Sequence, residues 1–127
     1  MKIYIASPYG DFEKTRIVMR VLEADGHVIT HDWTKLADQF PEDNAPKELR
    51  KQHAFEDLAG ISLADAIVVL TPEDPSRGCG MWIEMGAALM TTKRVLVVGP
   101  QRNRSVFSEL SETYETAQEA REALRNR

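Results

Sequence analysis

The chain has 127 residues, is 43% hydrophobic and carries a formal net charge of −4, from 20 acidic and 16 basic side chains. This length predicts one domain, residues 1–127, that buries about two thirds of the surface of its unfolded chain. One cysteine excludes an internal disulfide, and the excess of acidic side chains argues against binding to nucleic acid polymers. The absence of a membrane-spanning run or signal sequence predicts a cytoplasmic protein.

The first part of the chain predicts a strand, a helix and a second strand. Residues 2–6 are mostly apolar and predict a strand. Asp11 is a suitable N-cap for a helix from 12 to about 25, which Gly26 ends. The residues at 27–30, several of them β-branched, then predict the second strand and complete a crossover unit.

The polar stretch from 31 to 45 predicts a loop with a short helical turn at 35–39, and long loops beside a sheet edge are usually functional. Pro46 suits the first turn of a helix that runs to about 63. Four residues of this helix recur at every fourth position and predict a stripe that faces protein, namely Leu49, His53, Asp57 and Ile61. Four others are predicted to point to water, namely Lys47, Arg50, Lys51 and Glu56.

The stretch from 64 to 99 organises the rest of the chain. Residues 66–70 form a short apolar run that predicts a strand buried on both faces. Residues 73–80 contain too much proline and glycine for regular structure and predict a loop. A helix at 81–90 and a second buried strand at 95–98 follow. Strand, helix and strand in this order predict a right-handed crossover, whose loops at the carboxyl ends of the strands bind ligands.

After a loop at 101–107, residues 113–115 predict a short edge strand, and Thr116 caps a last helix that runs to about 125. Together these elements predict an α/β, single-domain, flavodoxin-like three-layer fold with a five-stranded, mostly parallel sheet in the order 2-1-3-4-5. The functional loops are then those after the first, third and fourth strands, namely 7–10, 76–80 and 103–107.

Glu84 is the first candidate for chemistry. It is predicted to lie near the start of its helix, where the helix dipole favours the ionised carboxylate. A carboxylate held ionised in a cleft can act as a nucleophile. The alternative is an acid that only offsets the helix dipole at the surface, and the bare sequence favours neither interpretation.

Asp57 is the second candidate, because an acid on a stripe that faces protein needs a reason to be there. Acids on helices are usually solvated, which is the alternative. Two carboxylates around one site indicate cleavage of a glycosidic bond through a covalent glycosyl-enzyme intermediate.

Other patterns are weaker. His27 and His31 lie roughly 13 Å apart on a strand, too far to share a metal, and one cysteine gives no zinc motif, so no metal is expected. No sequence feature ties a base to Cys79, which is predicted to be an inert packing group, and the glycines around it complete neither a dinucleotide fingerprint nor a phosphate-binding loop. Four aromatic residues either stack on a base or belong to the core, namely Tyr4, Tyr9, Trp33 and Trp82.

Several short segments of the chain carry a resemblance to a known family. They are 2–7, 57–58, 64–69, 76–78, 83–89, 93–100 and 106–107. These segments, above all the glycine-containing loop followed by Glu84-Met85-Gly86, resemble the nucleoside 2-deoxyribosyltransferase family, which includes the 2'-deoxynucleoside 5'-monophosphate N-glycosidases. The likeness covers nearly the whole chain in the same order, and the stretch from 33 to 46 is the least covered.

The resemblance implies that Glu84 attacks the anomeric carbon of a deoxyribose and forms a covalent ester. It implies that Asp57 binds the sugar hydroxyls or helps to protonate the leaving base, that Tyr4 orients Glu84, and that Trp33 or His31 flanks the base. The implied substrate-binding residues are Ser7, Tyr9, Gly10, Trp33, Ser76 and Gly78, with Asn103 and Ser105 completing the site of a neighbouring subunit. The family implies a nucleoside or nucleotide substrate, no metal or organic cofactor, and a homodimer or higher homo-oligomer.

The chain departs from the family in its first loop. The nucleotide-specific hydrolases carry a serine and an arginine there, where this chain has Pro8 and Gly10. Ser76, Arg77 and Ser105 are then the remaining candidates for a 5'-phosphate pocket. We therefore expect a transferase that moves the deoxyribosyl group to another nucleobase.

Three alternatives stay open at the level of the sequence. A 2'-deoxynucleoside 5'-monophosphate N-glycosidase uses the same covalent intermediate but lets water intercept it. A dinucleotide glycohydrolase also works with one carboxylate. The third is a non-catalytic nucleotide-binding module on the same fold, in which Glu84 only offsets the helix dipole.

Overall fold

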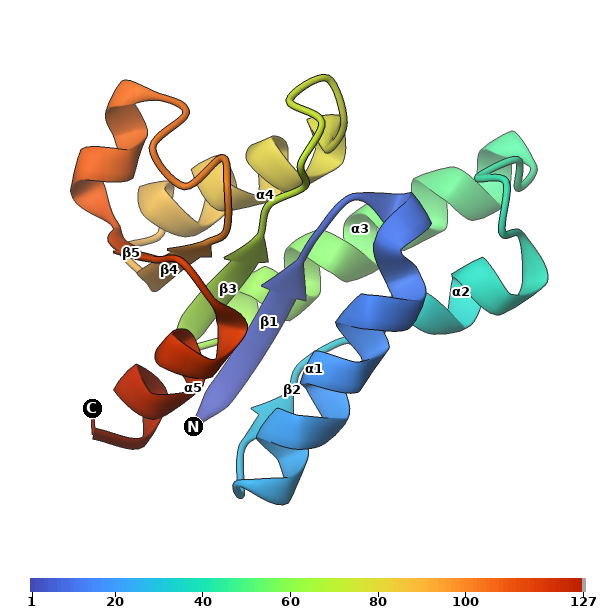
Figure 1. Cartoon of the computed structure of the whole chain (residues 1–127). Coiled ribbons are helices and arrows are strands. Elements are labelled where there is room, and N and C mark those ends of the chain that lie inside the picture. Colours follow the sequence, from blue (N-terminus) through green and yellow to red (C-terminus); the bar gives the residue numbers. More distant parts are fainter. Residues whose placement is uncertain (127) are drawn as a thin grey trace.

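The computed structural model describes residues 1–126, in which strands and helices alternate along the chain (Figure 1). The strands are β1 (Lys2–Ala6), β2 (Val28–Ile29), β3 (Ala66–Leu70), β4 (Arg94–Val98) and β5 (Glu112–Tyr114). The helices are α1 (Phe12–Ala24), α2 (Thr34–Gln39), α3 (Lys47–Leu63), α4 (Cys79–Met90) and α5 (Ala117–Asn126). Two 3₁₀ turns, η1 (Tyr9–Asp11) and η2 (Val106–Leu110), complete the elements of this part of the chain.

The five strands form one sheet in the order β2-β1-β3-β4-β5, and every neighbouring pair is parallel. The predicted strand order and flavodoxin-like topology are therefore confirmed, and the sheet is fully rather than mostly parallel. The order reverses direction at β1 and β3, which pair through Ile3 with Ala66 and Ala6 with Val69. This switch point opens a crevice at the carboxyl ends of the two strands.

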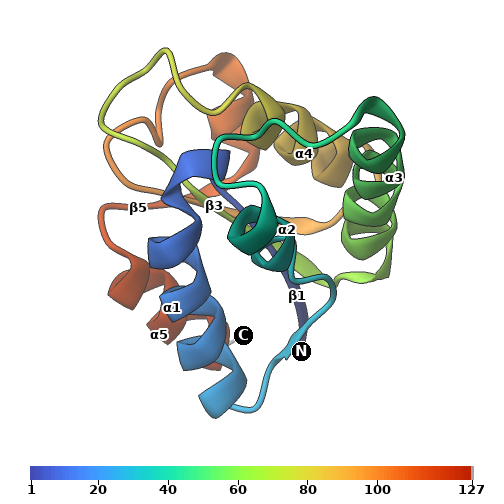
Figure 2. The same cartoon turned by 90° about the vertical axis from the view of Figure 1, so that its right-hand side faces the viewer.

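Helices cover both faces of the sheet. α1 and α5 lie on one face, α3 and α4 lie on the other, and α2 packs beside α1 (Figures 1 and 2). The three layers that the sequence predicts are thus present. Because β1 and β3 pair in parallel, the loops that follow them meet at the same edge of the sheet.

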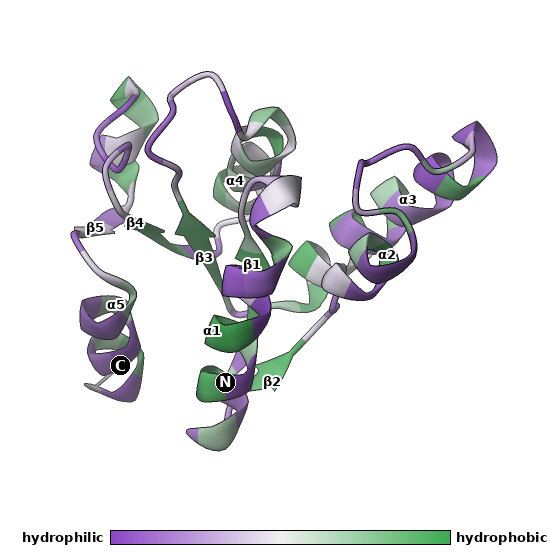
Figure 3. Cartoon of the chain, turned by 45° about the vertical axis from the view of Figure 1, so that its right-hand side comes forward, coloured by the Kyte–Doolittle hydropathy of each residue, from purple (hydrophilic) through white to green (hydrophobic). Residues whose placement is uncertain are grey.

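The core is centred on β1, β3 and β4. Strand residues such as Ile5, Ile67 and Leu96 are fully buried, and Figure 3 shows β3 and β4 in the hydrophobic colour, while α5 is mostly in the hydrophilic colour. Parallel strands covered on both faces need continuous apolar runs, which explains the strand sequences. In this setting the buried phenol ring of Tyr4 stands out, because its hydroxyl group needs a polar partner.

Helix ends differ from the sequence prediction where backbone geometry decides them. α4 begins at Cys79, two residues earlier than predicted, because Gly78 adopts a left-handed conformation (φ 94°) and turns the loop directly into the helix. Asp11 takes the N-cap position of α1, but its carboxylate caps no backbone N–H; it accepts a hydrogen bond from Arg77 instead. Thr116 caps α5 as predicted, in a reciprocal capping box with Glu119.

None of the helices in residues 1–126 combines the length and the apolar character that crossing a bilayer requires.

Candidate active site

A cleft of about 500 Å³ opens at the carboxyl ends of β1 and β3, between α3 and α4. This volume is in the range of small-molecule sites. Three walls form the cleft: the loop after β1, the region of α2 and α3, and the start of α4. The lining residues that matter below are Ser7, Tyr9, Trp33, Asp43, Arg50, His53, Asp57, Gly78, Cys79 and Glu84.

Glu84 and Tyr4 make the central contact of the cleft. The Tyr4 hydroxyl donates a hydrogen bond to Glu84 Oε2 at 2.5 Å, although the two residues are 80 positions apart in sequence. Tyr4 is fully buried on β1, so its position is fixed by the core. The bond occupies one carboxylate oxygen of Glu84 and leaves Oε1 for another partner.

The electrostatic state of Glu84 is the opposite of the one predicted from the sequence. Burial raises the pKa of Glu84 to about 8; the hydrogen bond from Tyr4 opposes this shift, and the negative charge of Asp57 reinforces it. Glu84 lies in the second turn of α4, beyond the reach of the helix dipole, which acts mainly within the first turn. Burial also raises the pKa of Tyr4 far above its usual value, so its hydroxyl stays protonated and remains a donor.

Asp57 reaches the same place from α3. It lines the cleft, and its charge acts on both Tyr4 and Glu84. Gly60, one turn further along α3, makes this approach possible: a Cβ atom there would lie 2.8 Å from His31 Cβ and 3.1 Å from the Tyr4 ring. The helix can therefore lie against β1 only because this position has no side chain.

Two histidines stand beside Asp57. His31 Nε2 is 3.4 Å from Asp57 Oδ1, and the ring centroids of His31 and His53 are 6.3 Å apart. The contact with Asp57 raises the pKa of His31, while burial lowers it. His53 faces the cleft itself, whereas His31 does not line it.

The long segment between β2 and α3 closes one side of the cleft. Trp33 stacks on Tyr9 with ring centroids 6.0 Å apart, and its indole N–H donates to the Ile5 carbonyl. The Tyr9 hydroxyl donates to the Phe40 carbonyl at 2.7 Å. These bonds give the two aromatic rings fixed positions in the wall, so the prediction that this loop serves the site has a physical basis.

The predicted site residues fall into two groups. Those that the structure brings to the cleft are Glu84, Asp57, Ser7, Tyr9, Trp33 and Gly78, with Tyr4 behind Glu84. Those that do not line it are Gly10, Ser76, Asn103 and Ser105. Ser76 instead donates to Asp74, and Ser105 caps η2 by accepting a hydrogen bond from the N–H of Phe107.

Ser7 is in the cleft wall but its hydroxyl is already engaged. It lies 2.6 Å from the hydroxyl of Thr15, and it also donates to the Pro8 carbonyl. Arg77, a candidate for a phosphate pocket, is held by Asp11 at 2.9 Å and does not line the cleft. The loop after β1 therefore offers a bound ligand mainly backbone and aromatic surface.

Sequence reasoning missed Arg50 as a cleft residue. The prediction that it points to water is wrong in part: about half exposed, it lines the cleft, paired with Asp43 at 3.0 Å. The signal that could have found it is its place one turn before His53 on α3, on the side that leads to Asp57.

The described residues contain no cluster of three or more histidine, cysteine or acidic side chains arranged to hold a metal ion. Cys79 is exposed at the mouth of the cleft, so it is not the buried packing group that the sequence predicts. The first residue of α4 takes this exposed position because the left-handed Gly78 sets the helix start there.

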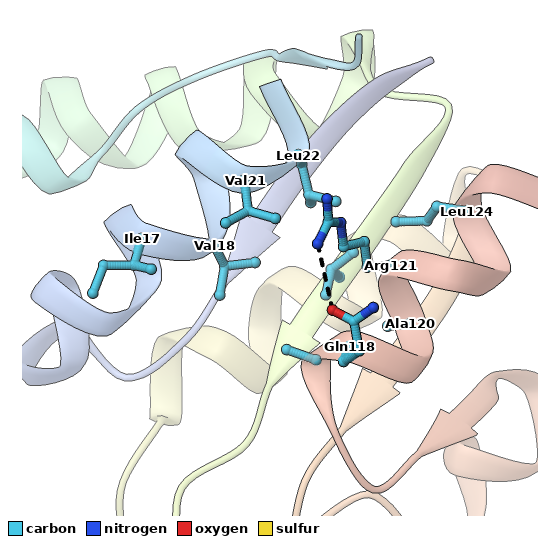
Figure 4. Close-up of a pocket in the computed structure, with 10 residues that line it drawn as sticks. Ile17, Val18, Val21, Leu22, Gln118, Ala120, Arg121 and Leu124 are labelled. Atoms are coloured by element: carbon cyan, nitrogen blue, oxygen red, sulfur yellow. Dashed lines mark hydrogen bonds between the residues drawn. The ribbon is translucent and has the colours of Figure 1, made fainter. Parts of the chain in front are cut away.

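A second cavity of about 160 Å³ lies on the opposite face of the sheet, between α1 and α5 (Figure 4). Its wall is mostly apolar, from side chains such as Val18, Leu22 and Leu124. Its polar groups are used within the protein, since Arg121 contacts Gln118 and pairs with Asp25. It offers a ligand no convergent set of free polar groups.

The fold and cleft together define a flavodoxin-like α/β protein with a carboxylate pair at its switch point. Comparison of the sequence with protein-family models and with curated proteins finds no match. Solved structures do match. A 2-deoxyribosyltransferase from Bacillus psychrosaccharolyticus is 24% identical, with a TM-score of 0.68 over 95% of this chain and 90% of that chain.

A CMP N-glycosidase from Clostridium botulinum is 18% identical, with a TM-score of 0.62 over the full length of both chains. The resemblance to the nucleoside 2-deoxyribosyltransferase family is thus confirmed at the level of the fold, and the structural relatives are proteins named for reactions at N-glycosidic or deoxyribosyl bonds.

Proposed function

We propose that this protein cleaves the N-glycosidic bond of a 2'-deoxynucleoside and transfers the deoxyribosyl group to another nucleobase. The observation that carries the proposal is the contact of Glu84 with the buried Tyr4 hydroxyl, next to Asp57, in a cleft of about 500 Å³. Two carboxylates and a fixed phenol at one anomeric carbon are the groups that a double displacement needs.

In this mechanism Glu84 Oε1 attacks the anomeric carbon while Tyr4 holds Oε2. The bond from the anomeric carbon to the base nitrogen breaks, an ester to Glu84 forms, and Asp57 gives a proton to the leaving base. In the second half the nitrogen of a new base attacks the anomeric carbon, the bond from this carbon to Glu84 Oε1 breaks, Asp57 takes back the proton, and Glu84 is released as a carboxylate. No step needs a metal or an organic cofactor.

Proton placement follows from the pKa of Glu84. The resting carboxyl is protonated at neutral pH because its pKa is about 8. Glu84 can attack only as a carboxylate, so its proton must first move to a neighbouring base. Asp57 is that neighbour, and the same proton then serves the leaving base. One proton shared by two carboxyl groups thus supplies both the nucleophile and the acid.

The cleft walls favour an unphosphorylated nucleoside. Arg50 is the one lysine or arginine among the described residues that line the cleft, and it is paired with Asp43, while Arg77 is paired with Asp11. The two stacked rings of Tyr9 and Trp33 suit a planar base. This arrangement supports the transferase over a monophosphate N-glycosidase.

A homodimer or higher oligomer is part of the proposal. Several large apolar side chains are exposed near the cleft and on η2, namely Phe55, Leu58, Ile83, Val106, Phe107 and Leu110. A second copy that covers them would remove apolar surface from water and could bring Asn103 and Ser105 to a neighbouring site. Light scattering during gel filtration measures the assembly directly, and a monomer at micromolar concentration would remove this part.

The test is chromatographic detection of free base and of new nucleoside from a panel of deoxynucleosides and their 5'-monophosphates, with and without a second base. New nucleoside that forms only when a second base is present supports the transferase. Base release from monophosphates alone would replace it by the hydrolase. No release from any substrate, with ligand binding that Glu84→Ala leaves unchanged, would favour a non-catalytic binding module.

A further inference from the structure

His31 and Asp57 form a half-buried pair in which Asp57 belongs to the wall of the cleft and His31 lies behind it. His31 Nε2 lies 3.4 Å from Asp57 Oδ1, and within the described residues neither atom is open to solvent or hydrogen-bonded to any other group. Asp57 lines the cleft and His31 does not. His31 therefore contacts the reacting groups only through Asp57.

The backbone holds this pair together. His31 lies in the segment between β2 and α2, and its Cβ would be 2.8 Å from any Cβ at Gly60 of α3. The same glycine lets α3 approach the Tyr4 ring. The close packing of α3 on this segment thus fixes the distance from His31 to Asp57.

Negative groups surround His31. Asp57 and Glu56 face it from α3, together with the His53 ring, and Asp32 is its neighbour in the chain. The charge of a protonated His31 also lowers the pKa of Glu84 on α4. Asp32 already pairs with Arg20 at 2.7 Å, so Asp57 is the main partner of the imidazole. This contact raises the pKa of His31.

We propose that His31 is a positioning residue that acts through Asp57 and sets the acidic limit of the pH range in which the enzyme works. The inference rests on the proposed function, because it assigns a step in the same reaction. It concerns His31, a titratable group beside Asp57 that the mechanism above does not use.

The physical reason is competition for the Asp57 carboxylate. A protonated His31 favours the anionic form of both carboxyl groups, but it contacts Asp57 directly at 3.4 Å, so it favours the state in which the shared proton stays on Glu84. When His31 loses its proton, this preference is removed and the proton of Glu84 can move to Asp57. The Glu84 carboxylate then attacks, the bond to the base breaks, and Asp57 passes the proton to the base nitrogen.

The first experiment compares pH profiles of kcat/KM for wild type, His31→Gln and His27→Gln. Gln keeps a donor for Asp57 but carries no charge, and His27→Gln is a matched control because His27 lies before β2, where it contacts the N-terminal amine. We expect kcat/KM of wild type to fall at least about fivefold from its plateau to about pH 6. The His27→Gln profile should follow wild type.

For His31→Gln we expect the fall at about pH 6 to be less than about twofold, with a plateau within about tenfold of wild type. A residue with only a structural role would lower the whole profile and leave its acidic limb in place. An acidic limb that is the same in His31→Gln and wild type therefore overturns the proposal.

A second measurement is independent of turnover. The chain has three histidines, so NMR titration of their ring protons can be assigned with single His→Gln variants. We expect the pKa of His31 to lie above its usual range in wild type and to fall in Asp57→Asn. An unchanged His31 pKa in Asp57→Asn contradicts the coupling. If wild type releases no base but this shift is seen, the proposed function fails while the coupling of His31 to Asp57 stands.

Discussion

Two clusters of charged side chains lie on opposite faces of the sheet and are built in opposite ways. At the end of α1, Asp25 is held by Arg121 at 2.7 and 2.8 Å and by Arg125 at 3.1 Å, and these bonds keep the pKa of Asp25 well below its usual range. In the cleft, no lysine or arginine of the described residues pairs with Glu84, whose pKa is raised to about 8.

Under the proposed function, the difference separates a structural cluster from the candidate functional one. The carboxylate of Asp25 is paired with two arginines of α5, so it links α1 to α5 and both of its oxygens already have partners. Glu84 accepts a hydrogen bond from the Tyr4 hydroxyl but has no lysine or arginine partner among the described residues, so burial keeps its pKa high. The apolar groove of Figure 4 lies beside the Asp25 cluster, so a cavity alone does not mark the site here.

The largest effect is expected from Glu84→Gln. Gln is nearly isosteric and can still accept the Tyr4 hydrogen bond, but it cannot form the ester, so turnover should fall by more than about 10⁴-fold with the fold intact. Base release measured by chromatography checks this. Residual activity within about tenfold of wild type would remove Glu84 as the nucleophile.

The same variant should be more stable than wild type in alkali. Between pH 4.5 and about 8 the folded protein keeps a proton on Glu84 that the unfolded chain releases, so wild-type stability falls as pH rises through this window. The full difference between the folded and unfolded pKa of Glu84 corresponds to about 5 kcal/mol of stability, and screening by water in the open cleft reduces this to about 1–3 kcal/mol. Urea unfolding of both proteins at about pH 9 measures the gain.

Asp57→Asn should follow, with a loss in kcat of about 10²- to 10⁴-fold, as expected when a proton donor is removed. The loss should shrink for substrates whose leaving base needs no proton, such as an activated aryl deoxyriboside. An equal loss for natural and activated substrates would mean that Asp57 binds the sugar rather than serving as the acid.

Gly60→Ala tests how closely α3 must approach. The new methyl would lie 2.8 Å from His31 Cβ and 3.1 Å from Tyr4, so we expect a loss of about 1–3 kcal/mol in the free energy of unfolding and of about 10- to 100-fold in kcat. Gly86→Ala is the matched control, since apart from its chain neighbours and the nearby backbone of α4 no atom of the described structure lies within 4 Å of the added carbon. It should be neutral or slightly stabilising.

The pH dependence gives a smaller but more diagnostic effect. If one shared proton serves both carboxyl groups, kcat/KM should fall about tenfold per pH unit above about 8, where the pair loses that proton. In Asp57→Asn this alkaline limb should disappear. A rate that instead rises up to about pH 8 and stays high would mean that Glu84 must be ionised but that Asp57 supplies no proton.

The smallest effect on activity is expected from Asp25→Asn, which should change kcat by less than about twofold because the cluster lies on the other face. The stability that Asp25 contributes is present at neutral pH and is lost as pH falls below its unfolded value of 3.8. Thermal melts should therefore show a lower Tm for the variant at neutral pH and a smaller difference in acid. A large loss of activity in Asp25→Asn would contradict the conclusion that the Asp25 cluster has no part in the reaction.

The sequence predicted much of the fold because its signals are local. The apolar runs at 2–6, 66–70 and 95–98 fit only buried parallel strands, and Gly26 and the 73–80 loop mark clear breaks. Sheet order followed from general rules of crossover handedness. The boundary of α4 was missed because the conformation of Gly78 depends on how the loop packs on Met81, which no local pattern reports.

The candidate site residues could be predicted from the sequence where they belong to family motifs, but not elsewhere. Glu84, Asp57 and Tyr4 meet as expected, but the predicted ionisation of Glu84 was wrong, since burial depends on contacts between β1, α3 and α4. Arg50 was predicted to point to water because helix periodicity does not report the loop that packs against it. Ser76 and Ser105 bond within their own segments, and whether Asn103 and Ser105 reach another subunit stays a prediction.

The 80-residue separation of Tyr4 and Glu84 has a consequence for biosynthesis. β1 is made first, yet its buried hydroxyl gains its partner only when α4 has been made and has packed on the sheet. Until then a growing chain carries a phenol group in its future core without a polar partner, and α3 has no neighbour to close the cleft. Because its partners lie on elements far apart in the sequence, the candidate nucleophile Glu84 becomes buried only after these long-range contacts have formed.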